Sequence, residues 1–143
     1  MGSDAALTMV RRLSRSHAGT APGVLFAQLA GEFEMERDVV RSVLRQLGSS
    51  PISMKRAAGY ASGVAFQSLA GGTSGSLAMF RTLESLLIGV QGKRCLWRAL
   101  QALELHFDEA ARFMTLEQQA LDQWQRLETL RQDQVPLVFG VTA

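Results

Sequence analysis

The sequence predicts an all-α protein built as a four-helix bundle. Apolar residues recur at spacings of three and four along one short and three long segments, as on the buried face of an amphipathic helix. No segment shows the alternation of apolar and polar residues that is typical of a β-strand. One long connection, residues 49–75, separates two pairs of helical segments. We therefore expect two antiparallel hairpins joined by a crossover.

The composition favours one domain over residues 1–143. The chain is 47% apolar and 20% charged, which is ordinary for a globular protein of its length. Its single cysteine, Cys95, favours a reducing compartment, so we expect a cytoplasmic protein. No apolar run approaches the roughly 18 residues needed to span a bilayer, and the first residues lack the features of a secretion signal. Neither a membrane anchor nor secretion is expected.

The charge pattern argues against a nucleic-acid partner. The formal net charge is only +2, which is weak support for binding a polyanion. Arg37, Arg41 and Arg45 share a segment with Glu34 and Asp38. Mixed charges at helical spacing are typical of a solvated face with internal ion pairs.

The first hairpin is predicted from its turn chemistry. A helix is expected from residue 4 to residue 17, where Gly19 ends it. Thr20 is suited to cap a second helix over residues 21–47. Pro22 is tolerated in the first turn because its missing N–H would have no partner within the helix.

The second helix should face the core through a narrow apolar stripe. At 100° per residue, that stripe contains Phe26, Leu29, Phe33, Val40, Leu44 and Leu47. Glu36 projects into the stripe. A buried carboxylate requires a partner, so we expect an arginine to hold Glu36 in a structural role, and we expect the same for Glu117 of the fourth helix.

The second half of the chain predicts two more long helices. The crossover, 49–75, should contain a short helix over residues 53–70. A third helix is expected over residues 76–103, and its inward side carries Met79, Leu83, Leu87, Val90 and Trp97. The fourth, over residues 109–132, faces inward through Phe113, Ala120, Trp124 and Leu127. Residues 134–143 form an apolar tail that should pack against the bundle or a partner chain.

Several features in order carry a family resemblance. A short Leu-rich helix begins at Asp4, and the second helix has an acidic centre over residues 32–38. That helix closes on the run Leu-Gly-Ser-Ser-Pro at 47–51, and the third helix carries Glu84 and Gln91 seven residues apart. In this pattern the chain resembles the bacterial stress-associated ferritin-like proteins of the YciE/YciF type.

The resemblance spans most of residues 4–130 and implies a ferritin-like bundle that pairs as a homodimer, with a role in the stress response. It also implies a metal site made of glutamates from the first and third helices and Glu-x-x-His motifs from the second and fourth. In this chain Ala6 stands where the first glutamate is expected. Phe33 and Glu36 occupy the positions of the second-helix motif, and Glu84 matches the third-helix acid. The metal site is therefore degenerate.

The two histidines do not restore the site. Ser14 stands three residues before His17, and Leu103 stands three residues before His106, so neither belongs to a Glu-x-x-His motif. We expect no metal, no other cofactor and no catalytic residue. The residual candidates for metal ligands are carboxylates near the inward faces, namely Glu36, Glu84 and Glu117. Carboxylates without imidazole would suit a hard cation.

The favoured interpretation is a non-catalytic ferritin-like scaffold or interaction protein, a homodimer that could also bind another protein. One alternative is an enzyme, a dimetal-carboxylate oxidoreductase, or a metal-binding protein that holds iron or manganese with an unusual ligand set. The other alternative is a binding module for an acidic partner. A fold by itself does not decide among them.

Overall fold

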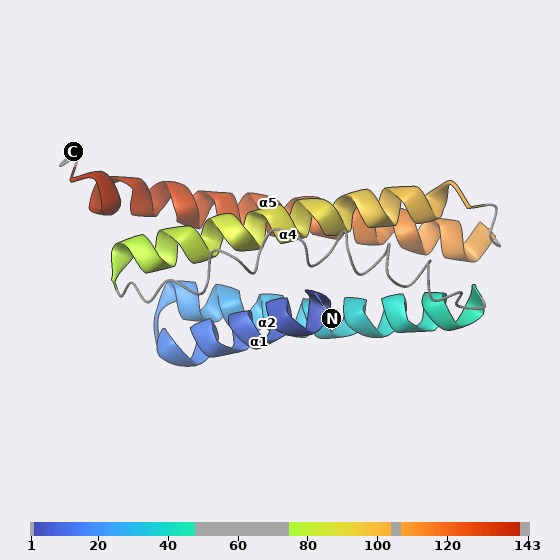
Figure 1. The fold of residues 1–143 in the computed structure, drawn as a ribbon, viewed down its shortest axis with the longest axis horizontal. Coiled ribbons are helices and arrows are strands. Elements are labelled where there is room, and N and C mark those ends of the chain that lie inside the picture. Colours follow the sequence, from blue (N-terminus) through green and yellow to red (C-terminus); the bar gives the residue numbers. More distant parts are fainter. Residues whose placement is uncertain (1, 48–74, 104–106, 141–143) are drawn as a thin grey trace. The chain divides into compact units, whose positions relative to one another are not determined.

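The computed structural model describes residues 2–47, 75–103 and 107–140, and within these ranges the protein is all-helical, with no strand (Figure 1). The helices are α1 (Gly2–Ser16), α2 (Ala21–Gln46), α4 (Ser76–Gln101) and α5 (Phe107–Phe139). The all-α prediction is confirmed for this part of the chain. The predicted crossover, 49–75, and its short helix lie outside the described residues except for Gly75.

The chain divides into two compact units, residues 1–62 and 63–143. The first contains the antiparallel pair α1 and α2, and the second contains the antiparallel pair α4 and α5 (Figure 1). Both predicted hairpins are therefore present. Within the described ranges, no helix combines the length and the apolar character that a bilayer crossing requires. A single domain over 1–143 stays a prediction.

The turn between α1 and α2 forms as its residue types predict. Gly19 has a φ of +81°, the left-handed conformation in which glycine commonly ends a helix. Thr20 is the N-cap of α2, and its hydroxyl oxygen accepts a hydrogen bond from the N–H of Gly23 at 3.2 Å. Pro22 lies in the first turn of α2. These contacts satisfy backbone groups that a helix end leaves free.

The close approach of α1 to α2 requires glycine at position 23. A Cβ placed there would overlap the carbonyl oxygen of His17 and lie 2.7 Å from its carbonyl carbon. That carbonyl oxygen already accepts hydrogen bonds from the backbone N–H of Thr20 at 3.1 Å and from its hydroxyl. Gly23 therefore permits the geometry that the Thr20 cap depends on.

The buried face of α2 departs from the predicted stripe in its second half. The buried residues are Gly23, Phe26, Leu29, Phe33, Glu36, Val39 and Val43. Val40 and Leu44 are half-buried and Leu47 is exposed, so the prediction was wrong beyond Glu36. The buried positions follow steps of three and four residues that average less than 3.6, so the stripe drifts around the helix. The predicted stripe was assumed to run straight along the helix, and it therefore missed this drift.

The α4–α5 hairpin has an apolar core that matches the prediction closely. Leu83, Leu87, Val90 and Trp97 of α4 are buried, as are Phe113, Ala120 and Leu127 of α5. Met79 and Trp124 are only half-buried. The fully buried Trp97 ring stacks on Phe113, with ring centroids 6.0 Å apart and planes 15° apart. An aromatic pair of this kind fixes one helix against the other.

α5 is longer than predicted, because it continues through Pro136 to Phe139. The segment predicted as a tail, 134–143, is thus helical up to Phe139. Proline removes one backbone hydrogen bond of a helix. The last turn contacts α4, since the Phe139 ring meets Phe80 edge-on at a centroid distance of 5.9 Å. Gly140, at a φ of +66°, follows the helix.

Candidate functional site

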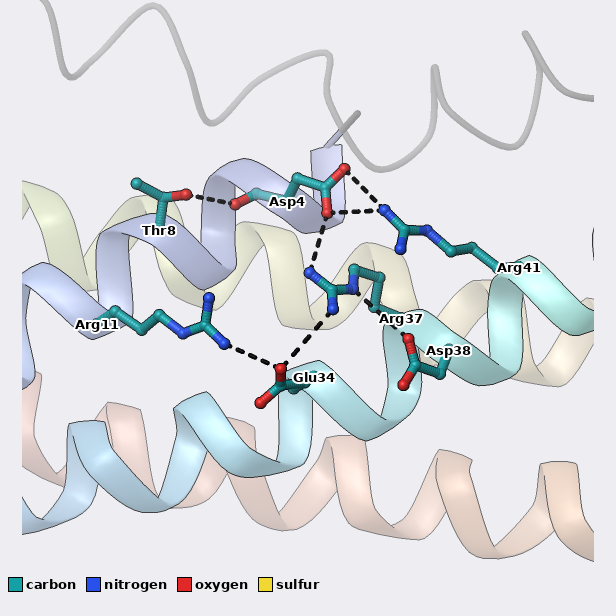
Figure 2. A network of polar contacts seen from close by, with 7 residues as sticks. All are labelled: Asp4, Thr8, Arg11, Glu34, Arg37, Asp38 and Arg41. Atoms are coloured by element: carbon teal, nitrogen blue, oxygen red, sulfur yellow. Dashed lines mark hydrogen bonds and ion pairs between the residues drawn. The ribbon is translucent and has the colours of Figure 1, made fainter.

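An ion-pair network joins α1 to α2 (Figure 2). One Asp4 carboxylate oxygen lies 3.4 Å from Arg37 Nη1 and 3.3 Å from Arg41 Nη2. Farther along α1, Arg11 Nη2 lies 3.0 Å from Glu34 Oε1. Arg37 Nη2 lies 3.8 Å from that same Glu34 oxygen and so connects the two groups. The predicted charged face is therefore paired, chiefly across the hairpin.

This network is structural. Asp4, Glu34, Arg11 and Arg41 keep between 45% and 56% of their side chains exposed, so each pair contributes at most about 1 kcal/mol. Arg37 is the more buried centre, at 19%, and its Nε also lies 3.7 Å from Asp38 Oδ1. Together the pairs join Asp4 and Arg11 of α1 to the middle of α2.

A groove of about 310 Å³ opens on the α4–α5 hairpin. It is lined by Arg94, Arg98, Gln101, Met114, Glu117, Gln118 and Leu121. Glu117 is the one carboxylate among these described lining residues. Glu117 accepts hydrogen bonds from Gln101 Nε2 at 2.8 Å and from Arg98 Nε at 3.1 Å, while Arg94 Nε lies 3.9 Å away. The prediction of an arginine partner for an inward-facing acid is confirmed for Glu117.

These contacts keep Glu117 ionised. The hydrogen bond from Gln101 lowers the pKa of Glu117, and the charges of Arg98 and Arg94 lower it further, against the opposing effect of desolvation. An ionised carboxylate has no proton to donate at neutral pH. Glu117 therefore acts as an anchor for the two arginines.

A second arginine, Arg131, holds the other end of the hairpin. It donates to both oxygens of Glu128, at 2.7 Å from Nε and 2.8 Å from Nη2. Its Nη1 lies 3.7 Å from Glu84, and its Cζ lies 5.4 Å from the centre of the Phe80 ring. Hydrogen bonds from Arg131 and then Gln132 lower the pKa of Glu128 to about 2. Arg131 thus connects α5 to both a carboxylate and a ring of α4.

One fully buried polar residue, Gln123 of α5, was missed by sequence reasoning. Its Oε1 accepts a hydrogen bond from Lys93 Nζ of α4 at 2.7 Å. A signal was present, because position 123 continues the spacing of the buried residues Phe113, Leu116 and Ala120. The prediction considered apolar residues alone and passed over an amide in the same register.

Two of the three candidate metal ligands, Glu84 and Glu117, are not brought together by the α4–α5 hairpin. Glu84 of α4 pairs with Arg131 of α5, and Glu117 of α5 pairs with Arg98 of α4. Along α4, Glu84 and Arg98 are separated by about 14 residues, or about 21 Å. Glu36 belongs to α2, in the other unit, and is 2% exposed, as its predicted helical phase required. Its pairing with an arginine stays a prediction. Among the described residues no group of three His, Cys, Asp or Glu side chains is arranged to hold a metal ion.

His17 has a structural place at the end of α1. Its Nδ1 lies 3.0 Å from the carbonyl oxygen of Leu13, and its ring is 6.0 Å from the ring of Phe26 on α2. His106 lies outside the described residues. His17 therefore contributes to the α1–α2 turn.

Comparisons of the chain with protein-family models, curated proteins and solved structures gave no match. The contacts within the two hairpins are therefore what bears on function.

Proposed function

We propose that the chain is a non-catalytic, ferritin-like interaction protein that works as a homodimer. One observation carries this proposal: the last turn of α5 leaves Leu137 67% exposed and Phe139 64% exposed. Exposed apolar side chains at one end of a hairpin mark a surface for protein contacts, and here they lie on two sides of the last turn of α5, since residues two apart in a helix do not face each other. The resemblance to the YciE/YciF type, in which homodimers are expected, supports the same conclusion.

The apolar surface extends onto the start of α4. The contact of Phe139 with Phe80 brings the end of α5 beside the first turns of α4, where Leu77 is 39% exposed. We call Leu77, Leu137 and Phe139 the end patch. A two-fold symmetric dimer could bury the end patches of both chains in one contact.

The carboxylates of the α4–α5 hairpin support a non-catalytic role. Glu117 and Glu84 each face an arginine, and metal binding would require them to give up those partners. Along α4, Glu84 lies about 21 Å from Arg98, the partner of Glu117, which is far greater than the spacing of ligands on one metal pair. These acids stabilise the hairpin in the proposed function.

Light scattering at micromolar concentration tests the proposal. The wild-type chain should have twice the mass of one chain. The double variant Leu137→Asp, Phe139→Asp should be a monomer with unchanged helix content, because aspartate opposes burial of the end patch. The control is Val24→Asp, at an apolar position of α2 that is 57% exposed, and it should remain a dimer. A monomeric wild type, or a double variant that still dimerises, would contradict the proposal.

A cytoplasmic location and a role in stress physiology form part of the proposal. Cys95 is exposed and is the one cysteine of the sequence, which suits a reducing compartment. The stress role rests on the resemblance alone. Cell fractionation should recover the protein with cytoplasmic markers, and recovery in the medium would count against this location.

A further inference from the structure

We propose that the groove on the α4–α5 hairpin binds an acidic segment of a partner protein, in which a carboxylate side chain neighbours an aliphatic one. The inference rests on the proposed role as an interaction protein. It concerns a surface distinct from the end patch, since the groove lies near Arg98 and Glu117 and the end patch lies at Phe80 and Phe139.

The positive side of the groove comes from two arginines one helical turn apart. Arg94 and Arg98 both direct their Nε toward Glu117, at 3.9 Å and 3.1 Å. The Arg98 side chain is 72% exposed, and its terminal nitrogens form no ion pair or hydrogen bond with another described residue. A guanidinium that uses Nε for one carboxylate can still donate from its terminal nitrogens to a second.

Glu117 holds the two arginines in position in the free protein. The Glu117 side chain is 18% exposed, and its second carboxylate oxygen accepts a hydrogen bond from Gln101 at 2.8 Å. Two guanidinium groups against one carboxylate give the described lining residues of the groove a net positive charge. Arginines that are already positioned lose less conformational freedom on binding, and the excess charge is complementary to an acidic ligand.

The remaining lining residues decide the class of ligand. Met114, 61% exposed, and Leu121 give the groove an apolar side. Methionine adapts to varied aliphatic partners. Inorganic phosphate would leave this apolar side unused, and single-stranded nucleic acid would find no aromatic residue on which to stack a base among the described lining residues. An acidic peptide with aliphatic neighbours matches both sides of the groove.

The test is fluorescence anisotropy with the full chain and a fluorescein-labelled peptide of alternating glutamate and leucine. The wild type should bind this peptide, and a peptide with glutamine in place of glutamate should bind more weakly. Arg98→Gln should weaken binding by about three- to tenfold, because it removes a partly exposed charge-assisted contact. The control, Arg112→Gln, changes an exposed α5 arginine that does not line the groove and should bind as the wild type does.

The readouts separate this proposal from dimerisation. The NMR signals of the Arg94 and Arg98 Nε–H groups should shift when the peptide is added, and the variant carrying Leu137→Asp and Phe139→Asp should bind with unchanged affinity. Equal affinity for the glutamine peptide, undiminished binding by Arg98→Gln, or displacement of the peptide by inorganic phosphate at matched concentration would each overturn the proposal.

Discussion

Substitution of Gly23 should destabilise the α1–α2 hairpin strongly. An alanine Cβ at this position would overlap the carbonyl oxygen of His17 and lie 2.7 Å from its carbonyl carbon, and both are backbone atoms that do not rotate away. Overpacking of this kind costs about 1–3 kcal/mol. Any displacement of His17 also disturbs its two hydrogen bonds with Thr20, and loss of a helix cap costs about 1 kcal/mol. Gly23→Ala should therefore lower the free energy of unfolding by about 2–4 kcal/mol.

Gly31 provides a matched control on the same helix. It is exposed, and a Cβ there would meet nothing within 4 Å. Gly31→Ala should raise the free energy of unfolding by about 0.5–1 kcal/mol, because alanine has the better helix propensity. Urea denaturation followed by far-ultraviolet circular dichroism measures both effects. The free energy of unfolding should fall on substitution at position 23 and rise on substitution at position 31. Equal stabilisation by both alanines would refute the close approach of α1 and α2 at Gly23.

Four further substitutions test the packing and the ion pairs. Trp97→Ala should lower the free energy of unfolding by about 3–5 kcal/mol, since the ring is fully buried; a thermal melt within a few degrees of wild type would show that it is not. Glu36→Gln should lower the free energy of unfolding by about 1–3 kcal/mol. Glu34→Gln, which changes a side chain that is 48% exposed, should lower it by less than about 0.5 kcal/mol. Equal, negligible losses in denaturant melts would contradict the burial of Glu36. The Glu128 pKa is lowered from 4.5 to about 2, so its pairing stabilises the fold above about pH 4.5 and this contribution is lost as the pH falls toward 2. Because Glu128 is near the surface, this loss of stability should stay within about 1 kcal/mol. The variant Glu128→Gln should not show the loss when its stability is followed during acid titration. Identical acid profiles for wild type and variant would argue against the pairing.

Local features of the fold were predictable from the sequence. The turn at Gly19 and Thr20 depends on residue types whose backbone preferences are strong, and the structure shows both in the expected roles. Glu36 was expected to be buried from helical phase alone, and it is. Phase is reliable over the three residues that separate Glu36 from Phe33, but its error accumulates over longer distances, as the exposed Leu47 shows.

Features that depend on two helices at once were not predictable. Asp4 and Arg37 are far apart in sequence and meet because of the register between α1 and α2. The pairing of Arg131 with Glu84 depends in the same way on α4 and α5. The extension of α5 through Pro136 was missed because proline usually ends a helix, and the contact of Phe139 with Phe80 depends on the position of α4 beside α5.

The candidate site was predicted only in part. Glu117 was identified as an inward-facing acid with an arginine partner, and the structure confirms this pairing with Arg94 and Arg98. The hydrogen bond from Gln101 to Glu117 depends on the position of α5 beside the last turns of α4. Composition and periodicity of one helix do not specify such a contact.

The central claim, a homodimer without a metal centre, is tested most directly by native mass spectrometry of protein purified without added metal. One spectrum reports both the number of chains and the mass of any bound ion. We predict a species of about 31 kDa, twice the 15.6 kDa of one chain, with no metal adduct. A monomer at micromolar concentration, or a dimer carrying near-stoichiometric iron or manganese, would contradict the account.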